Sequence, residues 1–164
     1  MGTIQDAQRI LREPGLQPGK HRELQIAIIE SFVPYFTTDS TVLYLGDAAN
    51  KFVIYERERL EELGVPMTMR GKLPDTMLYN EAKNLLFLIE AITSHGPIRP
   101  KRLFELKRLL KNCTPKRIYI SAFFDFAEYG RYVLPIAWDT HVWIAEIPEH
   151  MIHYNGDRYM GQHG

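Results

Sequence analysis

The stretch PDTMLYNEAKNLLFLIEAI, residues 74–92, decides the fold. Two runs with the composition of strands flank a polar, turn-like segment, so the stretch predicts a β-hairpin. If Asn80 pairs with Leu85 around a four-residue turn, every opposed pair follows from that register. Asp75 then lies directly across from Glu90.

This register would bring two carboxylates together. Opposed residues on antiparallel strands have Cβ atoms about 4.5–5.5 Å apart, and like charges there are destabilising. A cation between the carboxylates offsets that cost, and oxygen ligands of this kind favour Mg²⁺. Asp75 and Glu90 are therefore candidate metal ligands. The alternative is that Glu90 turns to solvent or pairs with an arginine, while Asp75 belongs to a turn.

Length and composition limit the class of protein. A chain of 164 residues with 45% hydrophobic residues fits one globular domain, residues 1–164. No apolar stretch approaches the ~18 residues of a membrane span, and the N-terminus lacks a signal-peptide core, so no membrane association is expected. A single cysteine, Cys113, excludes an internal disulfide framework and favours a reducing cytoplasm.

The net charge is zero, but the basic residues are unevenly distributed. Residues 99–117 contain eight lysines and arginines and one acid, Glu105. A neutral protein with one basic face can bind phosphates there. The alternative is a solvated helix face.

The order of patterns predicts an α/β fold: a mixed β-sheet flanked by helices. The segment 117–123 should run parallel to its neighbour, because a helix forms the connection. Asn155-Gly156 predicts a hairpin between 151–154 and 157–160. Helices are expected over 3–12, 21–35, 56–63, 100–111 and 125–134, and strands over 41–45, 117–123, 142–146 and 151–154, besides the hairpin.

Several longer motifs resemble the BsuBI/PstI family of type II restriction endonucleases. The resemblance covers roughly residues 20–162. The residues that carry it are GKLPD at 71–75, LIEAITSHGP at 88–97 with PKR at 100–102, LYLGD at 43–47, AWDT at 137–140 with Val142-Trp143, and HYNGDR at 153–158.

The resemblance implies a restriction-endonuclease-like fold of the PD-(D/E)XK type, which cuts phosphodiesters of double-stranded DNA with Mg²⁺. It implies that Asp75 and Glu90 bind the metal. Cutting both strands of a palindrome implies a homodimer, and a restriction system implies a cognate DNA methyltransferase that need not contact this chain. Members typically carry an N-terminal specificity region. Here residues 1–19 are expected to be only a short N-terminal extension, with that region absent.

One position departs from the pattern of this fold. The usual lysine stands two residues after the second carboxylate, where this chain has Ile92. His95 could orient or deprotonate water, and Lys101 could reach back from the next helix. Lys72 is a third option. Against Lys101, an ordinary ion pair with Glu105 four residues later would also explain it.

Other candidates surround this centre. The first long helix of such folds often supplies a further acid near the metal, which here would be Glu23 or Glu30; the alternative for both is exposed helix charge. Thr93 and Ser94 could cap the next helix or bind a DNA phosphate. Arg99, Arg102 and Arg108 are expected to contact DNA.

Three functions stay open at this stage. The first is a Mg²⁺-dependent, site-specific endonuclease; the second is an inactive DNA-binding or scaffold protein, which Ile92 favours; the third is a DNA-processing nuclease of low specificity. A zinc site is not expected, since the histidines lack ligand spacing of the H-x₃-H kind. Those considered are His21, His141, His150 and His153.

Overall fold

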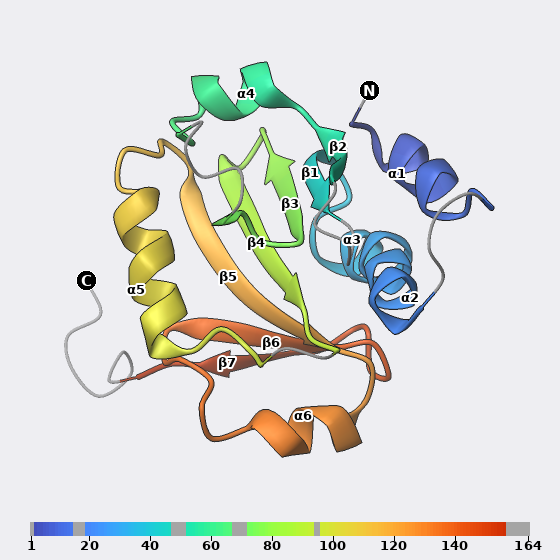
Figure 1. Cartoon of the computed structure of the whole chain (residues 1–164), viewed down its shortest axis with the longest axis vertical. Coiled ribbons are helices and arrows are strands. Elements are labelled where there is room, and N and C mark those ends of the chain that lie inside the picture. The colour runs from blue at the N-terminus through green and yellow to red at the C-terminus, as the bar shows by residue number, and fades with distance from the viewer. Residues whose placement is uncertain (1, 15–18, 47–51, 67–71, 94–95, 157–164) are drawn as a thin grey trace.

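The computed structural model describes residues 2–14, 19–46, 52–66, 72–93 and 96–156. Its centre is one mixed β-sheet (Figure 1). Its strands are β1 (Ser40–Gly46), β2 (Phe52–Tyr55), β3 (Thr76–Asn80), β4 (Leu85–Ala91), β5 (Lys116–Phe123), β6 (Thr140–Ile144) and β7 (Met151–Tyr154). Their order across the sheet is β2-β1-β3-β4-β5-β6-β7. The predicted class, a mixed sheet flanked by helices, is confirmed.

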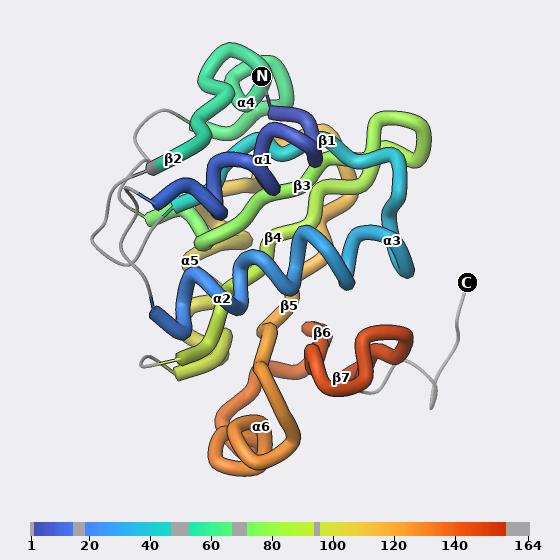
Figure 2. The backbone as a smooth tube through the Cα atoms, turned by 90° about the vertical axis from the view of Figure 1, so that its right-hand side faces the viewer, coloured from blue at the N-terminus to red at the C-terminus, as the bar shows by residue number. Residues whose placement is uncertain are grey.

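Helices cover both faces of this sheet. They are α1 (Ile4–Leu11), α2 (Lys20–Ala27), the π-helical turn η1 (Ile28–Phe32), α3 (Val33–Phe36), α4 (Arg57–Glu62), α5 (Pro100–Leu109) and α6 (Phe126–Tyr132). Figure 2 shows α1 and the α2–α3 helix lying over one face. In the described part of the chain, no helix has the length and apolar character needed to cross a membrane.

The β3–β4 hairpin has the predicted register. Asn80 pairs with Leu85, and the antiparallel ladder runs to the pair of Thr76 and Ile89. Continued one step beyond the ladder, the same register would set Asp75 against Glu90, and Asp75 Oδ2 accepts a hydrogen bond from the N–H of the next residue, Ala91. The turn length therefore fixes which residues meet at the far end of the hairpin.

The second half of the sheet is parallel, as predicted for 117–123. β4, β5 and β6 run in the same direction, with α5 connecting the first two. β7 returns antiparallel to β6 and forms an edge of the sheet. The second run of the expected hairpin, 157–160, lies outside the described residues. The other edge strand, β2, was not predicted, because four residues next to a charged helix give a weak strand signal.

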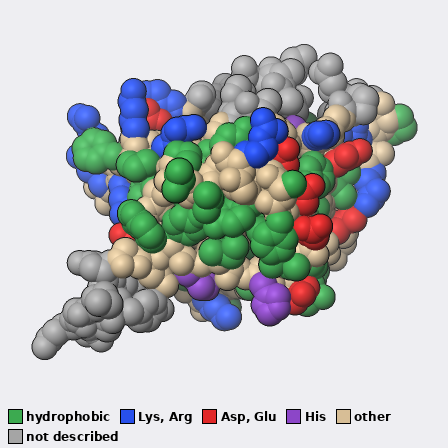
Figure 3. Space-filling view, turned by 90° about the horizontal axis from the view of Figure 1, so that it is seen from below, with side chains coloured by type: hydrophobic (Ala, Val, Ile, Leu, Met, Phe, Trp, Pro, Cys, Tyr) green, Lys and Arg blue, Asp and Glu red, His purple; other side chains and the backbone are tan. Residues whose placement is uncertain are grey.

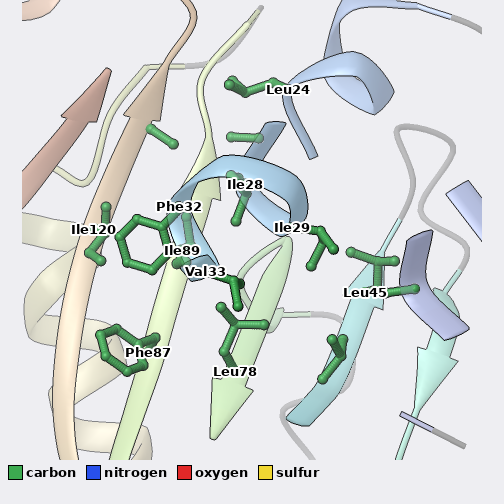
Figure 4. Packing of buried hydrophobic residues seen from close by; sticks show 14 of the residues in the cluster. Leu24, Ile28, Ile29, Phe32, Val33, Leu45, Leu78, Phe87, Ile89 and Ile120 are labelled. Carbon is green, nitrogen blue, oxygen red and sulfur yellow. The ribbon is translucent and has the colours of Figure 1, made fainter. Parts of the chain in front are cut away.

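The first face of the sheet packs under α1 and the α2–α3 helix. Alternate residues of β4, Phe87, Ile89 and Ala91, belong to this core cluster. Figure 4 shows Ile28 and Phe32 of the helix directed at this surface. α1 contributes buried residues to the same cluster, although its segment was expected to be only an extension.

The long helix predicted over 21–35 forms with one irregularity. The N–H of Val33 bonds the carbonyl of Ile28, five residues earlier, and creates the π turn. Pro34 follows immediately. In a regular α-helix its ring would press on the carbonyl of Glu30, so the wider turn accommodates the proline.

The opposite face packs under α5 and α4. Leu86 and Leu88 of β4 contact the cluster formed by Leu103, Leu106 and Leu110 of the α5 region. Glu90 has the same parity as the two leucines and therefore belongs to the α5 face. The two faces of one strand thus lead to two separate helical layers.

Candidate active site

The backbone around Asp75 is fixed from two neighbouring strands. The carbonyl of Asp75 accepts a hydrogen bond from the N–H of Gly46 at 2.9 Å. Its side-chain Oδ2 accepts from the N–H of Ala91 at 2.8 Å. The regular ladder between β3 and β4 ends at Thr76, and Pro74 has no N–H with which to continue it. The carboxylate therefore stands at the end of the hairpin.

The second oxygen of this carboxylate meets the first turn of α2. His21 Nε2 lies 3.3 Å from Asp75 Oδ1, and the two side chains are 16% and 30% exposed. A few residues on, Gln25 is buried and donates from Nε2 to the carbonyls of Gly46, at 2.5 Å, and Asp75, at 3.4 Å. Helix α2 therefore positions both the main chain and the side chain of Asp75.

Glu90 is held from the α5 layer. Its Oε1 accepts from Arg102 Nη2 at 3.0 Å. The same guanidinium donates to the carbonyl of Lys72 at 2.7 Å and to Glu105 Oε1 at 2.6 Å. Arg102 thus links the hairpin end, the segment before β3 and its own helix. This places a charge-assisted contact on each carboxylate from opposite sides of the sheet.

The two carboxylates fit a magnesium ion better than a structural transition-metal site. No group of three potential His, Cys, Asp or Glu ligands occurs among the described residues. Mg²⁺ does not need one, because it is usually bound by one or two carboxylates together with water and substrate phosphates. Asp75, just before β3, and Glu90, near the end of β4, would supply oxygen donors for that kind of binding.

A cavity of about 520 Å³ adjoins this end of the hairpin. It opens beyond the carboxyl ends of β4, β5 and β6, the edge at which α/β sheets commonly bind ligands. Ile92, two residues past Glu90, is part of its wall. The lining residues are Lys20, Glu23, Ile92, Thr93, Phe124, Asp125, Glu128, Ala145 and Glu146.

Two of the predicted site residues, Glu23 and Thr93, lie in this cavity wall. Lys20, which was not among the predicted residues, lines the same cavity as Ile92. Ser94 and His95 lie outside the described residues.

The other predicted basic residues have different surroundings. Lys72, Arg99, Lys101 and Arg108 are exposed. Glu105, which the alternative explanation of Lys101 required as its ion-pair partner, binds Arg102 instead. Arg102 was expected to contact DNA, but it is 25% exposed and its guanidinium is engaged within the protein.

Glu30 pairs with Arg12 and is not among the residues that line the cavity. Arg12 binds it through two contacts, from Nη2 to Oε1 at 2.6 Å and from Nε to Oε2 at 2.9 Å. This pairing raises the pKa of Arg12, first through the hydrogen bond and then through the charge of Glu30. Glu30 therefore ties α2–α3 to the end of α1, and Glu23 is the one of the two that reaches the cavity.

Sequence reasoning did not find His21 and Gln25. Both contact Asp75, which lies fifty or more residues away along the chain. One signal was present for Gln25: it is a polar residue next to the apolar stripe of Leu24 and Ile28, and a buried amide there requires a hydrogen-bond partner. No pattern in the sequence marks His21.

Comparison with known proteins agrees with the fold. Residues 6–157 match the family model of the BsuBI/PstI restriction endonuclease domain. The chain is 41% identical to the type II restriction enzyme BsuBI of Bacillus subtilis over 150 residues, 92% of this chain and 48% of that enzyme. It is 34% identical to the type II restriction enzyme AplI of Arthrospira platensis over 152 residues, 88% and 47% of the two chains.

A solved structure shows the same architecture. The SdaI restriction endonuclease superposes with a TM-score of 0.81 and 31% sequence identity, over 90% of this chain and 46% of that one. The chain therefore spans about half the length of the relatives it matches. The restriction-endonuclease-like fold is shown by this similarity. Because the family model covers nearly all of the chain, the protein belongs to the BsuBI/PstI restriction endonuclease domain family.

Proposed function

We propose that this chain is a DNA-cleaving domain that hydrolyses phosphodiester bonds of double-stranded DNA at a specific site with Mg²⁺. The observation that carries the proposal is that Asp75 and Glu90 both lie at the same end of the β3–β4 hairpin, each in contact with a basic side chain. The relatives named as type II restriction enzymes support the substrate class.

Each residue of the site has a distinct task in this proposal. A bound Mg²⁺ would polarise the phosphate and neutralise the charge that develops in the reaction. Asp75 and Glu90 would bind it. His21 and the N–H of Ala91 orient the Asp75 carboxylate, and Arg102 orients Glu90.

Charge near the scissile phosphate comes from the cavity beside Ile92. Lys20 of α2 lines this cavity together with Thr93. A lysine there can stabilise negative charge on the phosphate in the way the usual lysine of this fold would. Lys101 and His95 are the alternatives that the sequence suggests for the same task.

DNA would also contact the outer surface of α5. Arg99, Lys101, Lys107 and Arg108 are all exposed. Their charges suit contacts with the phosphate backbone, which set position and affinity but carry no sequence information directly.

A two-fold dimer is part of the proposal, because cleavage of both strands at a palindrome needs two symmetric sites. Figure 3 views the molecule from below relative to Figure 1, from the side on which α6 lies. Apolar side chains gather on this face. Phe126, Val133 and Leu134, in and just after α6, are exposed, and Leu134 is 93% exposed. A self-complementary contact between copies would cover such a surface.

The proposal also keeps two expectations from the sequence. A cognate DNA methyltransferase would protect the same site in host DNA without touching this chain. The protein would work in a reducing cytoplasm, which fits Cys113 as a free, buried thiol.

An inactive DNA-binding protein is the second candidate. Ile92 occupies the position of the usual lysine, and Arg102 already neutralises part of the charge of Glu90. Such a protein would bind DNA through α5 and cut nothing.

Cleavage of plasmid DNA in Mg²⁺ tests the proposal, with EDTA as the metal-free control. Wild type should cut at defined positions, whereas Asp75→Asn should bind DNA in Ca²⁺ but not cut. Glu149→Gln, at an exposed glutamate far along the chain, is the matched control and should cut normally. DNA binding without cutting by wild type would overturn the proposal and support the inactive candidate.

A further inference from the structure

Two histidines meet at the edge of the sheet, away from the hairpin. His141 of β6 and His153 of β7 are partners in the antiparallel register. Their Nδ1 atoms lie 2.7 Å apart, and their rings meet nearly at right angles, at 88°, with centroids 4.8 Å apart. We propose that this pair binds a late first-row divalent cation such as Zn²⁺, with both Nδ1 atoms as ligands.

The donor atoms decide the class of ion. Imidazole suits Zn²⁺, Cu²⁺ and Ni²⁺, whereas carboxylate and water suit Mg²⁺. Two nitrogens bound tetrahedrally at about 2.0–2.1 Å from Zn²⁺ would be about 3.3 Å apart. The pair therefore needs to open by about 0.6 Å, which small rotations of the two rings allow.

The position of the pair leaves room for such an ion. His153 is exposed and His141 is partly exposed. Water can therefore complete the coordination, because no third protein ligand of the His, Cys, Asp or Glu kind joins them within the part of the chain that is described. The site is then an open two-histidine site of moderate affinity, unlike the closed four-ligand sites of structural zinc.

Spacing rules for zinc motifs miss this pair. The two histidines are twelve residues apart in the chain, and neither follows the other at helical spacing. They meet because β6 and β7 are antiparallel and the register places them side by side. The sequence expectation of no zinc site considered local spacing alone.

The bound ion would fasten the edge of the sheet. β7 is only four residues long and contributes Tyr154 as its buried residue. The connection between β6 and β7 is already fixed by a hydrogen bond from Trp143 Nε1 to the carbonyl of Pro148 at 3.0 Å. A cation on His141 and His153 would close this connection at its open end and tie the edge strand to its neighbour.

The ion would be independent of the carboxylates of the hairpin. β5 separates β6 from β4, so the histidine pair and Glu90 are on non-adjacent strands. The proposal therefore does not rest on DNA cleavage and can fail or hold separately from it.

Titration of the full chain with ZnCl₂ in excess Mg²⁺, followed by calorimetry and thermal unfolding, tests the site. The excess Mg²⁺ would compete with Zn²⁺ for carboxylate oxygens. One Zn²⁺ should bind per chain and raise the melting temperature, and the imidazole Nδ1 resonances of both histidines should shift in ¹⁵N NMR spectra. His141→Gln and His153→Gln should each abolish that binding and the rise in melting temperature.

His150→Gln is the matched control. His150 is exposed and lies one residue before β7, where it contacts Glu149 at 3.9 Å. This variant should bind Zn²⁺ as wild type does. The proposal is overturned if wild type binds no Zn²⁺, if binding survives both substitutions in the pair, or if Mg²⁺ alone shifts the same Nδ1 resonances. In those cases the two rings share only a hydrogen bond.

Discussion

Asp75 and Glu90 lie at the same end of the β3–β4 hairpin, yet the two helical layers hold them in different ways. The α2 layer gives Asp75 a backbone N–H, an imidazole and a buried amide on its main chain. The α5 layer gives Glu90 a guanidinium that also binds two other oxygens. Asp75 is thus oriented mainly by fixed geometry, and Glu90 mainly by charge.

This difference shows how a hairpin tolerates two like charges. Arginine is always protonated in proteins, so the compensation on Glu90 is permanent. Histidine changes its charge near neutral pH, and an N–H carries only a partial charge. The site is therefore complete only when both layers are packed on the sheet, since neither layer contacts both carboxylates through the bonds described above.

The largest expected effect is on the cleavage rate, and it distinguishes substitutions of the two carboxylates from substitutions of the residues that contact them. Asp75→Asn and Glu90→Gln should each lower the cleavage rate by about a thousandfold or more, because metal stabilisation is worth several kcal/mol and about 1.4 kcal/mol is a factor of ten. His21→Gln and Arg102→Met should cost about ten- to a hundredfold, as for residues that orient ligands. Single-turnover rates in Mg²⁺ check this order. A histidine variant as inactive as Asp75→Asn would make His21 more than a support.

The next effect tests whether the layers are independent in stability. Ile28→Ala removes packing from the α2 side and Leu106→Ala from the α5 side, and both side chains are fully buried. Each should lower the free energy of unfolding by about 2–5 kcal/mol. Urea denaturation of the double variant should give the sum within about 0.5 kcal/mol.

Lys83→Ala is the control for these two variants, because an exposed side chain in the β3–β4 turn should change stability by less than about 0.5 kcal/mol. A clear departure from additivity would mean that the layers are coupled through the sheet.

A smaller effect distinguishes two arginines of the same helix. Arg108→Ala should weaken DNA binding at all sequences and lower the slope of log K against log salt by about one. Arg102→Met should leave that slope unchanged, because its guanidinium already binds carboxylates of the protein. Binding measured in Ca²⁺ at several salt concentrations checks both. An equal change in slope for the two variants would place Arg102 on DNA after all.

The smallest effect uses Cys113, which belongs to the α5 cluster. Burial raises the pKa of its thiol, and the nearby Arg117 opposes this shift. The folded chain should therefore react slowly with iodoacetamide, at a rate that keeps rising above the pH range of an ordinary thiol. Leu106→Ala should speed this reaction more than Ile28→Ala does. Equal acceleration would mean that the thiol reports opening of the whole molecule.

The sequence predicted the hairpin well because its register depends on local facts. The turn length and the alternation of faces determine that Thr76 meets Ile89. The same applies to the parallel pairing of β4 and β5, which the connecting helix requires. The two carboxylates of the candidate site followed from these local rules.

The residues that contact the two carboxylates could not be predicted in the same way. Arg102 was noted as a basic residue, but nothing in a helical pattern says whether a long side chain reaches solvent or a neighbouring strand. The contacts of His21 with Asp75 and of His141 with His153 depend on how distant segments pack. Such pairings become visible only when the sheet is assembled.

The π turn at Ile28–Phe32 sets the rotational phase of the longest helix. Each residue of an α-helix turns the chain by about 100°. Deleting one residue from the turn would leave Phe32 and Val33 on the sheet but rotate the preceding residues by roughly that angle. His21 and Gln25 would then leave Asp75. Homologous chains that differ by one residue between Gln25 and Pro34 should therefore contact this aspartate with different side chains.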